Sequence, residues 1–333
     1  MRQGKMMICV AALVFALCGF NAQAKEGFPL HVAVEFTDHA ASAYIAQYKG
    51  WFEEEGIRPT FYSYITGMSL AAALGRGDIQ SAYICLLPAI NARANAGVPI
   101  KIVAGTHKHG YGLAVNPDKV KTVKDLQKSG IRIGCVQTGG PVDATLLKTI
   151  EKYGLDRSKV LNKVLRMSPP KQMMAIRMGK LDASFSPEHW PAMAEDAGFK
   201  MLLSSQDVWP GMQGSVLIVK EELITDHPEI VRKLVAITRK ATTWINQTPE
   251  EAASVMAAQL QVAGDKVFPI ETAKTTATLA ISPKTVRRSM GRLEYTTDID
   301  SKGVQEAIDF AVQQGYIRKA FNAGDILDLR FSR

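Results

Sequence analysis

Cysteines, long apolar runs and clusters of like charge are scarce in this chain of 333 residues. Only four cysteines are present, and two of them lie within the first 24 residues. The other two, Cys85 and Cys135, stand in separate apolar, strand-like runs, which favours packed free thiols over a disulfide. After residue 20 no apolar run approaches the ~20 residues that a membrane-spanning helix needs. Neither a disulfide framework nor a later membrane span is therefore expected.

The net charge is only mildly positive. It is +8 for the whole chain and falls to +6 without residues 1–24, which hold Arg2 and Lys5 but no acidic residue. Lysine and arginine are scattered, without interleaved aromatic residues or zinc-ligand spacing, so nucleic acid is not expected as a partner. A weak attraction for anionic ligands is compatible with this charge.

Residues 1–24 have the layout of a cleavable secretory signal peptide. A short basic stretch precedes an apolar run over residues 6–20, and small residues lead up to Ala24. We therefore expect an exported chain that is soluble once processed. A lipid anchor at Cys18 is the less favoured alternative, because Leu17 is a poor fit to the small residue that such processing needs.

The middle of the chain repeats itself about a hundred residues further on. Residues 31–39 and 132–140 are both β-rich runs that end in a polar turn, and residues 73–83 match residues 175–185. Between these matches, a predicted helix ends at a glycine in each copy. Three matches in the same order predict two similar α/β lobes that face one cleft.

Hydrophobic periodicity predicts the elements of each copy. In the first copy we expect a strand from residue 31, an amphipathic helix over 40–55, a strand over 58–64, a short helix ending at Gly75 and a buried strand over 79–86. In the second copy one helix begins at Pro141 and closes at Gly154, and another begins at Ser168 with Pro169 and ends at Gly179. Strands that alternate with helices predict parallel sheets with covered faces.

The repeat is lost beyond about residue 217. A strand over 215–219, helices that begin near Pro228 and Thr248, and a C-terminal helix with an apolar face over 304–311 are expected there. Thr248 and Glu251 have the spacing of a capping box. The simplest arrangement returns this tail to the first lobe. The predicted first lobe is thus residues 25–113 and 218–333, and the second is residues 114–217. Two chain crossings, near 110–117 and 212–219, would form a hinge.

Several short motifs together resemble the periplasmic substrate-binding proteins of ABC importers in the nitrate, sulfonate and taurine group, whose relatives bind thiamine-precursor pyrimidines. The motifs are residues 44–52 with 55–57, 77–80 with Pro88, 97–101, 123–126, 179–183, and Pro187 with Trp190. The resemblance covers essentially the whole mature chain. It implies the two-lobed α/β periplasmic binding protein fold (type II), with two parallel-sheet lobes joined by two crossovers. It also implies a monomeric periplasmic receptor without a cofactor, which passes a small solute to a membrane permease driven by a cytoplasmic ATPase.

In open parallel sheets, ligands lie outside the carboxyl ends of strands and beside helix N-termini. This rule and the resemblance select eleven candidate ligand-binding residues. They are Asp38, His39, Tyr64, Thr66 and Cys85 in the first lobe, and Gln137, Thr138, Gly139, Gly140, Glu188 and Trp190 in the second. The paired glycines would let backbone N–H groups approach a ligand, and a helix N-terminus favours an anion.

Two features leave the nature of the ligand open. Tyr64, Trp190 and Trp209 could stack on a flat ring or wrap an alkyl chain, or they could belong to the core of a lobe. Asp38 and Glu188 would favour an amine or an amidine-like donor if they point into the cleft. If they instead cap helices or pair with lysine, a simple anion is favoured.

Metal and catalytic sites are not expected. His107 and His109, with His39 and His189, have no Cys, Asp or Glu at ligand spacing. No Gly-x-Ser-x-Gly motif or phosphate loop is present, and no base for Cys85 can be identified in the sequence. A pyrimidine-forming enzyme of the thiamine-precursor synthase type is the alternative from another class. A surface protein that binds a partner and no ligand is a third reading.

Overall fold

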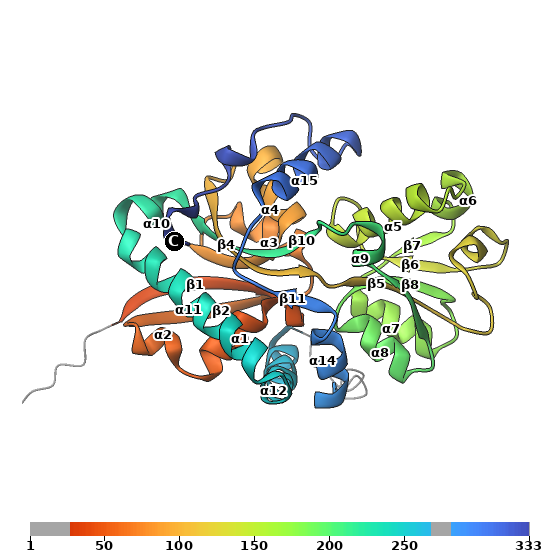
Figure 1. Cartoon of the computed structure of the whole chain (residues 1–333), viewed down its shortest axis with the longest axis horizontal. Coiled ribbons are helices and arrows are strands. Elements are labelled where there is room, and N and C mark those ends of the chain that lie inside the picture. The colour runs from red at the N-terminus through yellow and green to blue at the C-terminus, as the bar shows by residue number, and fades with distance from the viewer. Residues whose placement is uncertain (1–26, 268–280, 333) are drawn as a thin grey trace, which may run out of the picture.

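The computed structural model describes residues 27–267 and 281–332, and it contains two β-sheets covered by helices (Figure 1). The six-stranded sheet contains β1 (Phe28–Glu35), β2 (Ile57–Tyr64), β3 (Ser81–Cys85), β4 (Ile100–His109), β10 (Gln213–Lys220) and β11 (Leu293–Tyr295). The five-stranded sheet contains β5 (Tyr111–Val115), β6 (Ile133–Cys135), β7 (Val164–Arg166), β8 (Ala183–Pro187) and β9 (Lys200–Ser204). We call each sheet, with the helices packed on it, the first and the second lobe.

The helices lie between and after these strands. Those that precede β10 are α1 (Ala41–Tyr48), α2 (Trp51–Glu54), α3 (Gly67–Leu74), α4 (Leu86–Ala96), α5 (Pro141–Lys152), α6 (Arg157–Leu161), α7 (Pro169–Arg177), α8 (Trp190–Asp196) and α9 (Ser205–Val208). Those that follow it are α10 (Glu221–Asp226), α11 (Pro228–Gln247), α12 (Pro249–Val267), α14 (Pro283–Met290) and α15 (Ser301–Gln313). Short 3-10 helices include η1 (Asp38–Ala40) and η2 (Val123–Gln127).

The strand order confirms the internal repeat. The first lobe contains the parallel order β3-β1-β2, and the second contains the parallel order β8-β6-β7, each with its first strand in the middle. The prediction of wholly parallel sheets is wrong for the other strands, because β10 and β4 run antiparallel to their neighbours and so does β5. The chain enters β5 and β10 from the other lobe. No described helix packed on the same sheet precedes either strand and returns the chain to the parallel direction. The two-lobed α/β fold is nevertheless the predicted one.

The chain passes from one sheet to the other at Gly110, between β4 and β5, and again over residues 205–212, between β9 and β10. The crossings were predicted near residues 110–117 and 212–219. Most of the first stretch is strand β5, and most of the second is strand β10. The first passage is short and sharply bent, since His109 and Gly110 have φ angles of 63° and 88°. Left-handed backbone is costly for residues other than glycine, so this passage is a conformationally restricted link.

The predicted helix over 40–55 is interrupted. α1 ends at Tyr48, Gly50 adopts a φ of 72°, and α2 starts at Trp51. The Tyr48 side chain, at the end of α1 and next to the interruption, is 56% exposed. Thr248 and Glu251 have other partners than those of the predicted capping box. Thr248 Oγ1 donates to the Trp244 carbonyl, and Glu251 pairs with Lys49.

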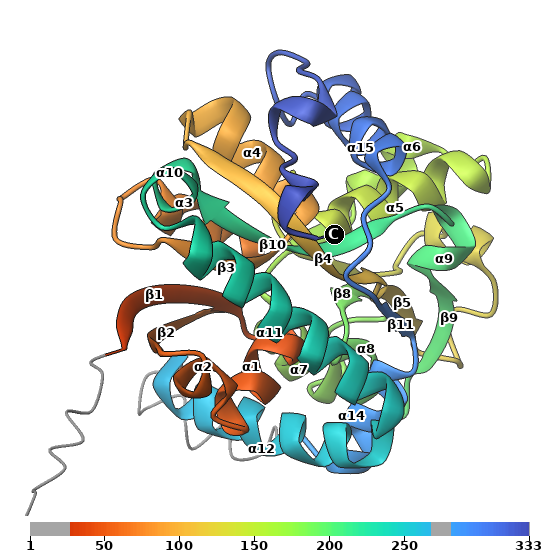
Figure 2. The ribbon, with the colours of Figure 1, turned by 60° about the vertical axis from the view of Figure 1, so that its left-hand side comes forward.

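The C-terminal segment returns to the first lobe. α15 packs on α4, and the Ile102 N–H donates to the Ile326 carbonyl at 2.7 Å. The Asp328 N–H in turn donates to the Ile102 carbonyl at 2.9 Å, and the end of the chain lies beside β4 in Figure 2. Cys85 and Cys135 are buried and free, as predicted.

We expect Gly110→Ala to destabilise the protein more than Gly130→Ala does. Both glycines have positive φ, 88° and 81°, which costs an alanine about 1–2 kcal/mol. Only Gly110 is also crowded, because a Cβ there would lie 2.8 Å from His39 Nε2 and 3.1 Å from Leu293 Cγ. The expected additional loss is about 1–2 kcal/mol, the range for overpacking. Urea unfolding of the two variants checks this difference, and equal losses would contradict the crowding.

Candidate functional site

A small cavity lies between the two lobes, where strands of both sheets end. First-lobe residues on its wall include Glu35, Thr37, Thr66, Gly67, Met68, Cys85 and Pro88, and second-lobe residues include Tyr111, Val136, Gln137, Gly140, Pro141, Pro169 and Pro187. Its volume is about 30 Å³. Since one water needs roughly 10–15 Å³ measured this way, the cavity has room for about two waters. A solute of several heavy atoms could enter only if the lobes moved apart.

Two helices begin at the wall of this cavity, one from each lobe. Thr66 caps α3 by accepting a hydrogen bond from the Ser69 N–H at 3.2 Å. Gly140 is the N-cap of α5, and Pro141 occupies its first turn. Gln137 Nε2 donates to Thr66 Oγ1 at 2.8 Å, which joins the lobes directly. The cavity thus lies between two helix N-termini, which favour negative charge.

Glu35, the last residue of β1, is the one carboxyl side chain on the described cavity wall. Its Oε1 accepts from the Cys85 N–H at 2.6 Å, and its Oε2 accepts from the Cys85 thiol at 3.0 Å. Gly67 makes room for it, since a Cβ there would lie 2.5 Å from Glu35 Oε1. Burial raises the pKa of Glu35 to about 7. The sequence reasoning missed Glu35, although its place at a strand's carboxyl end was an available signal.

His39 lies behind Cys85 and is held in one tautomer. Its Nε2 is 2.8 Å from the Gly110 carbonyl, which can only accept, so Nε2 carries the proton and Nδ1 is bare. Nδ1 is 3.9 Å from Cys85 Sγ, and Tyr111 donates its hydroxyl to that sulfur at 3.0 Å. The sequence identified no base for Cys85, and the structure places the His39 ring beside it. His39 is 46 residues away in the chain, so spacing could not reveal it.

Burial keeps this cluster uncharged. It lowers the pKa of His39 to about 4 and raises the pKa of the Cys85 thiol well above its ordinary value. A protonated thiol is a poor nucleophile. A cysteine lies beside a histidine, but burial favours the protonated thiol over the nucleophilic thiolate.

Asp38 and Glu188 are not among the residues that line the cavity. Asp38 accepts a hydrogen bond from the Ser289 hydroxyl, and Glu188 pairs with Arg292 at 3.1 Å. Burial raises the pKa of Asp38 to about 8 and that of Glu188 to about 7. Glu188 thus pairs with an arginine rather than with the lysine considered from the sequence, and Asp38 is bonded to a neutral hydroxyl.

The other predicted ligand-binding residues divide among several places. Thr66, Cys85, Gln137 and Gly140 line the cavity. Thr138 is exposed, and the Gly139 N–H donates to Asp143 Oδ2 at 3.3 Å. Trp190 is buried against Phe36 and His189, and Trp209 is buried against Phe310. Both tryptophans thus belong to the core of a lobe, which is one of the two alternatives considered from the sequence.

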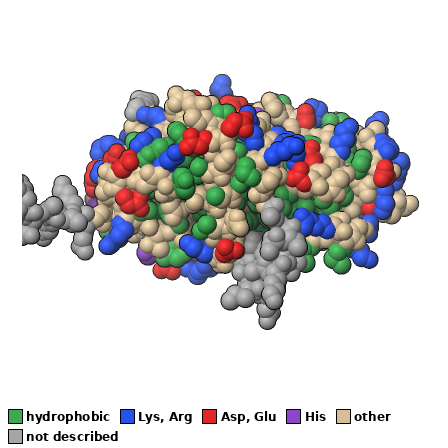
Figure 3. Space-filling model, turned by 90° about the horizontal axis from the view of Figure 1, so that it is seen from below, with side chains coloured by type: hydrophobic (Ala, Val, Ile, Leu, Met, Phe, Trp, Pro, Cys, Tyr) green, Lys and Arg blue, Asp and Glu red, His purple; other side chains and the backbone are tan. Residues whose placement is uncertain are grey.

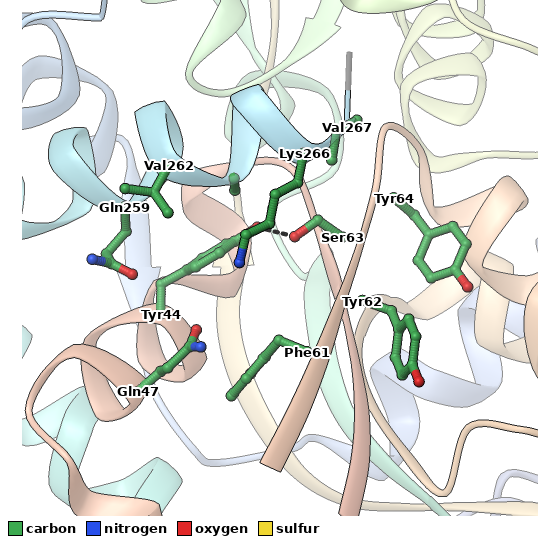
Figure 4. Close-up of a pocket in the computed structure, with 11 residues that line it drawn as sticks. Tyr44, Gln47, Phe61, Tyr62, Ser63, Tyr64, Gln259, Val262, Lys266 and Val267 are labelled. Carbon is green, nitrogen blue, oxygen red and sulfur yellow. Dashed lines mark hydrogen bonds between the residues drawn. The ribbon is translucent and has the colours of Figure 1, made fainter. Parts of the chain in front are cut away.

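Tyr64 lines a different pocket, of about 310 Å³. Tyr44, Phe61, Tyr62, Gln259 and Lys266 also contribute to its wall (Figure 4). Phe61 and Ser63 lie on one side of β2, whereas Tyr62 and Tyr64 lie on the other. This pocket lies between β2 and α12, within the first lobe, so a ligand in it would not bridge the lobes.

The lobes and the cavity between them define a class of two-lobed binding protein, and comparisons with known proteins agree. The chain belongs to the NMT1-like family, whose model matches residues 23–261. A binding protein of Brucella abortus is 27% identical over 231 residues, 66% of this chain and 67% of its own length.

Solved structures give the same architecture. The alkanesulfonate-binding protein of Xanthomonas axonopodis, bound to MOPS, superposes with a TM-score of 0.73 at 19% identity and covers 91% of this chain and 99% of its own. The periplasmic nitrate-binding protein of Synechocystis gives 0.73 at 13% identity and covers 92% and 87%. At these identities the likeness establishes the fold. Among the described residues, no helix is long and apolar enough to cross a membrane.

Proposed function

We propose that this protein is the periplasmic solute-binding component of an ABC importer. It captures a small polar solute between its lobes and presents the closed form to a membrane permease. The observation that carries the proposal is the cavity, which both sheets line and which two helix N-termini border. Binding between two hinged lobes favours the closed state by the contacts that closure adds.

A small anion such as a sulfonate or nitrate is the solute class that we favour. The N-termini of α3 and α5 attract negative charge, while Asp38 and Glu188 are occupied by Ser289 and Arg292. On the face seen in Figure 3, acidic and basic side chains are interspersed, so the cavity wall rather than a charged surface would select the solute. An aminopyrimidine remains the alternative class, with Glu35 as its partner.

A binder is favoured over an enzyme by the state of Cys85. Its thiol is buried and donates to Glu35 at 3.0 Å, so it is protonated and poorly nucleophilic. A turnover assay on candidate pyrimidine precursors would separate the two functions, because a binder returns its ligand unchanged.

The test is a thermal-shift screen of sulfonates, taurine, nitrate, bicarbonate and aminopyrimidines, followed by solution scattering. A solute at 100 times its Kd stabilises the folded state by about 2.7 kcal/mol. We expect Gln137→Ala to weaken that stabilisation, because it removes the bond to Thr66 across the cavity. Gln47→Ala, in the Tyr64 pocket, is the matched control and should bind as the wild type does. Absence of any stabilising solute, with no change in scattering, would favour a surface protein that binds a partner instead.

A further inference from the structure

We propose that Glu35, His39 and Cys85 bind one zinc-like divalent metal ion at the floor of the interlobe cavity. One carboxylate oxygen, one ring nitrogen and the sulfur lie within 4.8 Å of one another. They come from the end of β1, from η1 and from the end of β3. This site goes beyond the proposed solute receptor and does not depend on it.

The spacing of the three atoms is close to that of a tetrahedral site. Zinc bonds of about 2.0–2.3 Å to oxygen, nitrogen and sulfur imply ligand-to-ligand separations of roughly 3.5 Å. Glu35 Oε2 lies 3.0 Å from Cys85 Sγ, and His39 Nδ1 lies 3.9 Å from the same sulfur. Side-chain shifts of about half an ångström would therefore bring these two pairs to coordination geometry.

Each ligand also has an outer partner that orients it. His39 donates its Nε2 proton to the Gly110 carbonyl, which is the arrangement that metal-bound histidines require to present the other nitrogen. The Cys85 N–H holds the Glu35 carboxylate through Oε1, and this leaves Oε2 toward the sulfur. Tyr111 donates its hydroxyl to Cys85 Sγ at 3.0 Å. These bonds fix the tautomer and the rotamers before any ion arrives.

A bound divalent ion would also leave the buried cluster without net charge. A divalent cation bound to one carboxylate, one thiolate and one neutral imidazole gives a site with no net charge. Forming the bonds to Sγ and to Oε2 releases the thiol proton, and the carboxyl proton where it is present, to solvent. No lysine or arginine lies on the described cavity wall to take over this neutralisation.

The site is reached from the cavity. Glu35 and Cys85 line the cavity, whereas His39 lies behind them, so an ion would enter when the lobes part. The fourth position of a tetrahedral ion would then face the cavity, where water or a solute atom could occupy it.

The test is a Co²⁺ titration of the chelator-treated chain without any solute. Tetrahedral Co²⁺ reports its ligands through visible d–d bands and a thiolate charge-transfer band in the near ultraviolet. We expect one Co²⁺ per chain with that band, and its displacement by Zn²⁺. Cys85→Ser should lose the band and weaken binding at least 100-fold, and His39→Gln should weaken binding at least 10-fold. Cys135→Ser is the matched control, because Cys135 is equally buried and free but lies in the second lobe.

Three results would overturn the site. They are no stoichiometric uptake of Co²⁺ by the wild type, an unchanged band in Cys85→Ser, or loss of the band in Cys135→Ser. If Cys85→Ser does not fold, X-ray absorption of the Zn²⁺-loaded wild type decides, since one sulfur with nitrogen and oxygen neighbours is expected and a shell of oxygen alone contradicts the site. Because solute is absent throughout, failure here leaves the receptor function untouched, and failure of the solute screen leaves the metal site untouched.

Discussion

Replacing Arg132 with methionine is expected to lower the free energy of unfolding by about 2–3 kcal/mol. The Asp182 side chain is fully buried and accepts from Arg132 Nε and Nη2, both at 2.8 Å, and from Lys119 Nζ at 2.7 Å. Removing one partner of a fully buried ion pair costs about 3–5 kcal/mol, because the other charge is left uncompensated. The Arg132 side chain is 35% exposed and Lys119 remains in place, so the expected loss is smaller than for a fully buried pair.

The same carboxylate predicts how stability depends on acid. The hydrogen bonds from Arg132 hold the pKa of Asp182 well below its usual range. A group with a depressed folded-state pKa contributes stability above its unfolded pKa of about 4, and that contribution is lost as the pH falls toward the folded value. The wild type should therefore lose stability below about pH 4, and Asp182→Asn should lose less over that range.

Urea unfolding at neutral pH and at pH 3 measures both effects. Lys128→Met is the matched control, because Lys128 makes an ion pair with Asp125 but is 65% exposed, and such pairs contribute little. If Arg132→Met and Lys128→Met destabilised the protein equally, the buried carboxylate would not be the cause. If Asp182→Asn kept the full acid dependence of the wild type, other carboxylates would be responsible for it.

Much of the fold was predictable because each copy of the repeat carries the signals for its own strands and helices within short stretches of sequence. Each copy encodes its own strands and helices through periodicity and through terminal residues such as Pro141 and Gly154, and both copies form the same strand order. The antiparallel strands were not predictable in this way. Their direction depends on which sheet the chain enters after it crosses, and local sequence does not encode that.

The candidate site was predictable only in part. The rule that ligands lie at the carboxyl ends of strands selects Cys85, Thr66 and Gln137, which the structure places on the cavity wall. It also selects Asp38 and Glu188, whose partners Ser289 and Arg292 lie on a distant segment that packs against both of them. A side chain's direction is decided by such long-range partners, and no spacing in the sequence reveals them.

The second large expected effect is on the opening of the two lobes, when the hydroxyl group of Tyr316 is removed. Tyr316 links the lobes outside the cavity. Its hydroxyl donates to Asp143 Oδ2 of α5 at 2.5 Å, and Arg166 pairs with the same carboxylate at 2.6 Å. Its carbonyl accepts from Asn95 Nδ2 of α4 at 2.7 Å. The tyrosine thus connects a helix of the first lobe to a helix of the second, and opening the lobes must break one of these bonds.

Tyr316→Phe should therefore shift the ligand-free protein toward open forms. A hydrogen bond to a charged group contributes about 1.5–3 kcal/mol, so the ratio of open to closed molecules should rise roughly 10–100-fold. Solution scattering should record a larger radius of gyration, and saturating solute should reverse it, because the solute's contacts across the cavity remain. Tyr153→Phe, at the C-terminal end of α5 and partly exposed, is the control and should leave the radius unchanged. A variant as closed as the wild type would mean that the contacts lining the cavity, such as that of Gln137 with Thr66, hold the lobes together without Tyr316.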